Sequence, residues 1–242
     1  MIRQYFRIMI RSKTTITVMI ALILYTLIPV VNVNLLVSTA WERNPSFFNA
    51  NYASFFFTHG ATFFTVPLFF IFLQQNRAFF EKDCVIVRFA DCRRYWKIRT
   101  LVTALESAAY VLFIYFLIFL RSVYFKQSAG FLKGILFLLK AALSQTTMLF
   151  LLALLFCFIS YLTNQTVLAS ACAYFFVVND YTVLQTGRGV ELFALKAIAV
   201  TPESMNDYWF NLILVILIVA LFFVFSLLVV DSSKDHLQKR VL

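Results

Sequence analysis

Long apolar stretches separated by short polar ones run through the whole chain. About 20 apolar residues are needed to cross roughly 30 Å of hydrocarbon as a helix. Six stretches approach this length, and none has the alternating pattern typical of barrel strands. They are residues 15–36, 55–73, 101–120, 141–161, 167–184 and 210–230. The pattern predicts an all-α polytopic membrane protein with six transmembrane helices.

The positions of Lys and Arg predict the orientation, because these residues concentrate in cytoplasmic loops. With six helices and a cytoplasmic N-terminus, 14 of the 21 Lys and Arg fall on the cytoplasmic side. We therefore expect both termini to be cytoplasmic and the chain to lie in the plasma membrane. Residues 167–184 form the shortest stretch, and a five-helix alternative would put the termini on opposite sides.

Four bases on the predicted outer side, in residues 121–140, run against this count. Lys126, Lys133 and Lys140 are spaced by seven, so one helical face can carry all three to the outer interface. We therefore expect the fourth helix to begin before residue 141.

Residues 1–13 predict an amphipathic element that lies on the membrane lipid. Arg3, Arg7 and Arg11 recur every four residues, and apolar residues fill much of the other side. Such a pattern is typical of a short helix in the cytoplasmic interface. The alternative is a frayed basic terminus that only fixes the topology.

The composition agrees with a membrane protein. Hydrophobic residues make up 62% of the 242 residues and charged residues only 13%. A soluble domain of this length could not bury so much apolar surface. The net charge of +10 is explained by loop bases that set the orientation, and no nucleic-acid partner is expected.

The sequence lacks the motifs of common membrane enzymes. The five Gly form no phosphate-binding loop, and the two His and four Cys show no metal-ligand spacing. We expect no enzyme activity, cofactor or metal in this chain. If the protein moves a substrate by ATP hydrolysis, the ATPase must be a separate polypeptide.

Two polar residues lie within or near the predicted helices. Glu106 is close to the cytoplasmic end of the third helix, and a carboxyl group there either lines a translocation path or pairs with a base such as Arg99. His59 lies near the outer end of the second helix, where it is either a path residue or a hydrogen-bonded interfacial His. Residues 185–209 are expected to hold a short amphipathic outer helix.

Residues 76–100, predicted to be cytoplasmic, mix apolar positions with charges of both signs. Arg88, Asp91, Arg93 and Arg94 precede an aromatic pair, Tyr95–Trp96. Arg and Trp are favoured anchors at protein interfaces, so this pattern favours docking onto a partner. The alternative is a basic loop that lies on anionic lipid.

The order of elements and the run "VRFADCRRYW" resemble the bacterial ABC-2-type permeases. The resemblance implies a membrane subunit of a small ATP-driven exporter, paired with an ABC ATPase that binds ATP and Mg²⁺. It implies that a coupling segment at 76–100 contacts the ATPase. The contact residues would be Arg88, Asp91, Arg93, Arg94, Tyr95 and Trp96. It also implies an elbow helix at residues 1–13, a second permease copy in a homo- or heterodimer, and a peptide or amphipathic, lipid-like substrate.

The short, uncharged connection "LTNQT" between the fourth and fifth helices departs from the family pattern. In the family this connection can make a second contact with the ATPase, so docking here would fall to residues 76–100. Two other functions stay open: an ion-gradient-driven secondary transporter, and a membrane immunity or assembly protein that does not transport.

Overall fold

The computed structural model describes residues 2–27, 52, 55–80, 92–124, 135–190, 194–200 and 207–232, and most of these residues are helical, with no strand among them. The helices are α1 (Ile2–Arg11), α2 (Lys13–Leu27), α4 (Thr58–Gly60), η2 (Ala61–Thr65), α5 (Val66–Phe80), α7 (Cys92–Tyr124), α9 (Ile135–Thr163), α10 (Thr166–Thr186), α11 (Ala194–Ile198) and α12 (Tyr208–Ser232). The expected helical fold is therefore present.

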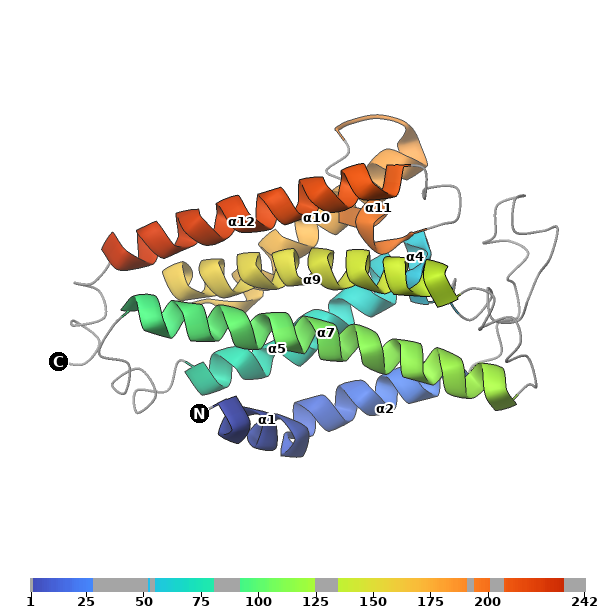
Figure 1. Cartoon of the computed structure of the whole chain (residues 1–242), viewed down its shortest axis with the longest axis horizontal. Helices are drawn as coiled ribbons and strands as arrows, with labels where there is room; N and C mark the ends of the chain where they lie inside the picture. Colours follow the sequence, from blue (N-terminus) through green and yellow to red (C-terminus); the bar gives the residue numbers. More distant parts are fainter. Residues whose placement is uncertain are drawn as a thin grey trace.

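The long helices lie side by side along the long axis of the molecule, and successive ones alternate in direction (Figure 1). Helix α9 is the central one, since it packs against α5, α7, α10, α11 and α12. Helix α12 lies at the edge of the bundle. Only 17% of its apolar 18-residue segment is buried, against 61% of the corresponding segment of α9. Helix α1 and the C-terminal end of α12 lie at the same end of the bundle (Figure 1).

Four of the described helices, α7, α9, α10 and α12, are long and apolar enough to cross a membrane. The pair α1–α2 would give a fifth span, although it is bent by 59°. Large apolar side chains face outward on these helices, including Leu112, Phe116 and Leu221 at 62%, 53% and 71% exposure. So much outward apolar surface is compatible with lipid rather than water around the bundle.

Helix α7 begins nine residues earlier than the predicted third transmembrane helix, and α9 begins at Ile135, before residue 141 as expected. At 1.5 Å per residue the 33 residues of α7 extend over about 50 Å, roughly 20 Å more than the hydrocarbon core. The first turns of α7 therefore project beyond the hydrocarbon if the rest of the helix crosses it.

The second predicted helix contains a π-helical turn, η2, which ends two residues before Pro67. Proline lacks an N–H and its ring clashes with the carbonyl four residues earlier, so the preceding turn widens. Tyr174 and Tyr110 donate hydrogen bonds to the carbonyls of Thr62 and Thr65, both at 2.8 Å. Helices α10 and α7 thus stabilise the irregular turn.

Helices α9 and α10 are joined by a tight reversal. Asn164 adopts a φ of 59°, a left-handed conformation that Asn tolerates better than most residues. Helix α10 ends at Thr186 and is capped by Gly187, whose φ is 64° and whose N–H donates to the Val183 carbonyl at 2.8 Å. The short connection is consistent with antiparallel neighbours that pack closely.

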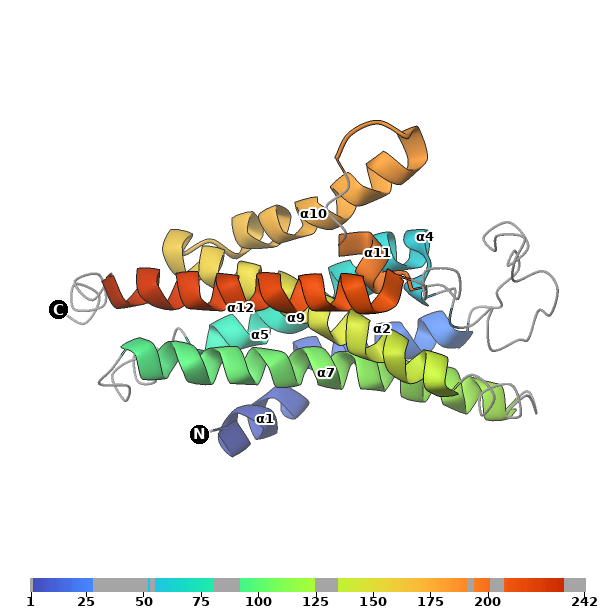
Figure 2. The ribbon, with the colours of Figure 1, turned by 45° about the horizontal axis from the view of Figure 1, so that its top comes forward.

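The expected outer helix in residues 185–209 is the short α11, and it is buried. Ala194, Leu195, Ala197 and Ile198 are each 3% exposed or less. In Figure 2, α11 lies between α10 and α12 at the end opposite α1. It packs against α9, α10 and η2 rather than lying open on the surface.

Candidate functional site: a buried polar cluster

Six side chains from four helices meet inside the bundle, at the end that carries α1. They are Tyr5 of α1, Asn76 of α5, Arg99, Thr103 and Glu106 of α7, and Cys157 of α9. We call these residues the buried polar cluster. All but Tyr5 and Cys157, at 1% exposure each, are fully buried.

Glu106 is enclosed by donors from two other helices. The Tyr5 hydroxyl donates to Glu106 Oε1, and the Asn76 amide donates to Oε2 at 2.7 Å. The Glu106 side chain is fully buried, and both of its expected roles, a path residue and a partner of a base, stay predictions. The carboxyl group connects α7 to α1 and α5.

Asn76 joins the carboxyl group to a buried guanidinium. Its Nδ2 donates to Glu106 and to Thr103 Oγ1 at 3.0 Å, while its Oδ1 accepts from Arg99 Nε at 3.3 Å. The amide therefore presents its donor to the acid and its acceptor to the base. Asn76 thus links Glu106 to Arg99, the base that the sequence offered as its partner.

Helix α7 brings three of these residues to one face. Arg99, Thr103 and Glu106 are four and three residues apart, which is the spacing of a helical stripe. Thr103 also bonds to the Arg99 carbonyl at 2.9 Å and lies 3.7 Å from Cys157 Sγ. The cluster thereby reaches the central helix α9.

The aromatic pair at the start of α7 extends the cluster toward α12. Tyr95 accepts a hydrogen bond from Arg99 Nη1 at 3.2 Å, and Trp96 Nε1 donates to Ser226 Oγ of α12 at 2.9 Å. The Arg99 guanidinium also lies 5.9 Å from the Trp96 ring centroid, a cation–π distance.

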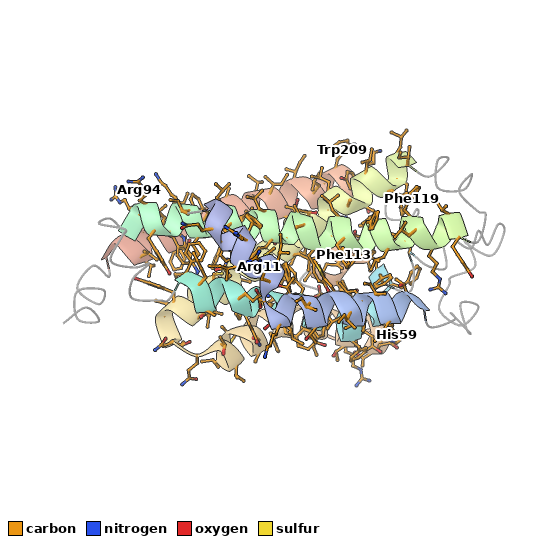
Figure 3. The ribbon with its side chains drawn as sticks, turned by 90° about the horizontal axis from the view of Figure 1, so that it is seen from below. Arg11, His59, Arg94, Phe113, Phe119 and Trp209 are labelled. Atoms are coloured by element: carbon orange, nitrogen blue, oxygen red, sulfur yellow. The ribbon has the colours of Figure 1, made fainter. Side chains whose placement is uncertain are left out.

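Tyr95 and Trp96 are buried, and their expected contact with an ATPase stays a prediction. Their exposed fractions are 3% and 0%, so they do not form a docking surface in this arrangement. The reason is that α7 starts at Cys92, and positions 95, 96 and 99 then face the interior. Arg93 and Arg94, on the outer side of the same turn, are exposed, and Figure 3 shows Arg94 at the extreme end of the helix.

Arg88 and Asp91 lie outside the described residues, as does Arg3's side chain. In the first helix, Arg7 and Arg11 are exposed as the amphipathic pattern predicts. The buried face of α1 is formed by Tyr5 and Met9, whereas Ile8 and Ile10 are 52% and 61% exposed.

His59 lies toward the opposite end of the bundle from Arg94 (Figure 3). It is exposed, its Nδ1 lies 3.0 Å from the Tyr181 hydroxyl, and its ring packs beside Phe63 and Tyr181. This agrees with the hydrogen-bonded interfacial alternative rather than with a place in the buried polar cluster.

A second polar group, not predicted from the sequence, surrounds α11. Gln145 Nε2 donates to the Ile198 carbonyl at 3.0 Å, Ser144 to the Ala197 carbonyl at 2.8 Å, and Tyr52 to the Val200 carbonyl at 3.0 Å. These bonds occupy carbonyls at the end of α11 that the helix itself leaves free. Asp180 accepts from the Leu195 N–H at the other end, at 3.0 Å.

Among the described residues no group of three or more His, Cys, Asp or Glu could hold a metal ion. Comparison with protein-family models, with curated proteins and with solved structures found no match.

Proposed function

We propose that this chain is the permease subunit of an ATP-driven exporter in the plasma membrane. It would work as a dimer of permeases with a separate ABC ATPase, which supplies bound ATP and Mg²⁺. In this proposal the six stretches predicted from the sequence cross the membrane, and both termini are cytoplasmic. The substrate class would be a peptide or another amphipathic molecule.

One observation supports this proposal most. The first turn of α7 carries exposed Arg93 and Arg94 on one side and buried Tyr95 and Trp96 on the other. A partner that binds the exposed bases is therefore one helical turn from side chains that contact α12 and Arg99.

The buried polar cluster connects this docking turn of α7 to other helices of the bundle. Through Arg99, Asn76 and Glu106 the same helix contacts α5 and α1. Packed interiors move as discrete units rather than deforming continuously, so a displacement of α7 would be passed to these helices. This is the behaviour expected of a coupling helix.

Co-purification tests the proposal. The tagged chain is extracted from its native membranes in detergent, and proteins that carry nucleotide-binding motifs are identified by mass spectrometry. We expect an ABC ATPase with the parent chain, and at least about a 30-fold loss of affinity in Arg93→Glu/Arg94→Glu, as for reversal of central interface charges. Arg188→Glu, an exposed base two residues after the end of α10, is the control and should retain the ATPase.

Normal recovery of the ATPase by the double variant would refute the docking assignment. The absence of any ATPase from the parent preparation would refute the exporter proposal itself. Membrane insertion of all three proteins is measured in the same samples, so that a loss of binding is not confused with a loss of folding.

A secondary transporter driven by an ion gradient is the second candidate. Buried carboxyl groups in membrane helices often belong to ion or proton pathways, and Glu106 is such a group. Transport that persists after ATP depletion, but stops when the proton gradient is dissipated or in Glu106→Gln, would favour it. Transport that stops on ATP depletion alone favours the exporter.

A further inference from the structure

Helix α1 is attached to the bundle by one narrow face. Tyr5 and Met9 are buried, Phe6 is half-buried, and Arg7, Ile8, Ile10 and Arg11 face away from the bundle. The Tyr5 ring lies edge-on to Phe79 at 5.0 Å and near Phe80 at 5.7 Å between centroids. Docking of α1 therefore depends largely on a single aromatic side chain.

The junction between α1 and α2 makes α1 a separate helix. The two helices meet at Ser12 and are bent by 59° relative to each other. The backbone at this bend is stabilised by bonds from the Ser12 N–H to Met9 and from the Ile16 N–H to Ser12, both at 3.1 Å. In Figure 3, α1 runs at an angle to the long helices, from beside α7 to its junction with α2.

The rest of the buried polar cluster is complete without α1. Asn76, Arg99, Thr103 and Cys157 bond among themselves, and Asn76 holds Glu106 Oε2. Only Glu106 Oε1 takes its hydrogen bond from Tyr5. Removing α1 would leave a preformed polar site with one open acceptor and two aromatic walls, Phe79 and Phe80.

We propose that α1 is a detachable lid over the buried polar cluster, and that the position of the Tyr5 side chain is a binding site for an aromatic hydroxyl group. The aromatic walls select a flat ring, and the Glu106 carboxyl group selects a hydrogen-bond donor at its edge. A phenol or the phenolic side chain of a peptide has both features. This inference does not depend on the exporter proposal, since it requires no ATPase.

Cys157 is a suitable reporter, because it is 1% exposed and lies 3.9 Å from Asn76 Oδ1 within the cluster. The full-length chain is prepared with Cys84, Cys92 and Cys172 replaced by Ser, so that Cys157 is the one thiol. Its rate of modification by a charged, water-soluble thiosulfonate then measures how often water reaches the cluster. Ile8→Ala, on the exposed face of α1, is the matched control.

We expect Tyr5→Ala to react about 100-fold faster than the parent, since loss of a buried aromatic removes several kcal/mol of packing. Tyr5→Phe keeps the ring and loses one hydrogen bond to a charged group, so we expect an increase of about tenfold. Ile8→Ala should react at the parent rate. Phenol should slow the reaction of Tyr5→Ala and raise its thermal midpoint, and toluene should do so much less.

A parent-like rate in both Tyr5 variants would overturn the lid. Equal effects of phenol and toluene on Tyr5→Ala would overturn the aromatic-hydroxyl site. If Tyr5→Ala does not fold, judged by its elution as aggregate, the Tyr5→Phe rate alone decides the lid. Phenol binding is then tested by its ability to speed the reaction of Cys157 in Tyr5→Phe through displacement of α1, and no change would refute the site.

Discussion

Replacement of Asn76 by Leu is the sharpest perturbation of the buried polar cluster. The two side chains have similar volumes, so the change removes hydrogen bonds while keeping most of the packing. Asn76 is fully buried and contacts Glu106, Arg99 and Thr103. In Asn76→Leu the acid and the base each lose the hydrogen-bond partner that α5 provides, while both remain buried.

The size of the effect follows from the kind of bond lost. A neutral interhelical hydrogen bond in a membrane contributes about 0.6 kcal/mol, and this applies to the Asn76–Thr103 contact. Hydrogen bonds to buried charged groups contribute about 1.5–3 kcal/mol each, because a charged group that loses its partner stays buried without the water that would solvate it. The Glu106 and Arg99 bonds therefore dominate, and we expect Asn76→Leu to lower the free energy of unfolding by about 3–5 kcal/mol.

Reversible unfolding in mixed micelles, followed by circular dichroism, measures this change. Asn179→Leu is the control, because Asn179 lies on α10 and makes one amide bond, at 2.9 Å to the Val190 carbonyl, near the surface. We expect Asn179→Leu to lower the free energy of unfolding by less than about 1 kcal/mol. A loss of less than about 1 kcal/mol in Asn76→Leu as well would refute the view that Asn76 bridges two charged groups.

Three further changes test separate contacts. Trp96→Phe should lower the free energy of unfolding by about 1 kcal/mol in the same assay. Adding Ser226→Ala should lower it little further, because both changes remove the same hydrogen bond. Fully additive losses in the double variant would contradict this contact. Gln145→Leu should lower the free energy of unfolding by about 2 kcal/mol and speed proteolysis near α11. Unchanged proteolysis would count against the view that Gln145 holds α11 in place. Tyr181→Phe removes a hydrogen bond to the exposed His59 and should change stability by less than about 0.5 kcal/mol, so a larger loss would show that this contact is buried.

Hydropathy alone predicted most of the helices, because apolar length is a local property. It placed the start of the third helix at residue 101, whereas α7 starts at Cys92. Arg93, Arg94 and Lys97 lower the hydropathy of this part, although they lie on the exposed side of a continuous helix. Charged residues on one face of a helix end the apolar stretch in the sequence, although the helix itself continues.

The buried polar cluster was only partly predictable. The stripe of Arg99, Thr103 and Glu106 on one face of α7 is visible in the sequence and could have indicated an inward polar face. Their partners could not be inferred, since Tyr5 is 101 residues from Glu106 and Asn76 is 30 residues away. Such pairings depend on how the helices pack, and hydropathy does not encode that packing.

The burial of Tyr95 and Trp96 could not be predicted, for a related reason. Aromatic residues next to bases are typical both of interfaces with partners and of the membrane interface. The helical register set by α7 decides between these and a buried position, and here it turns both side chains inward. The bases beside them, Arg93 and Arg94, are exposed, and their contact with an ATPase stays a prediction.

Site-specific photo-crosslinking tests the central claim, that the first turn of α7 contacts an ATPase. A photoreactive amino acid is placed at position 94 and, as a control, at position 188 at the opposite end of the bundle, and both proteins are irradiated in native membranes. The account predicts a crosslink from position 94 to a protein that mass spectrometry identifies by its nucleotide-binding motifs, and none from position 188. Crosslinks from position 94 to lipid alone, with no such protein, would contradict it.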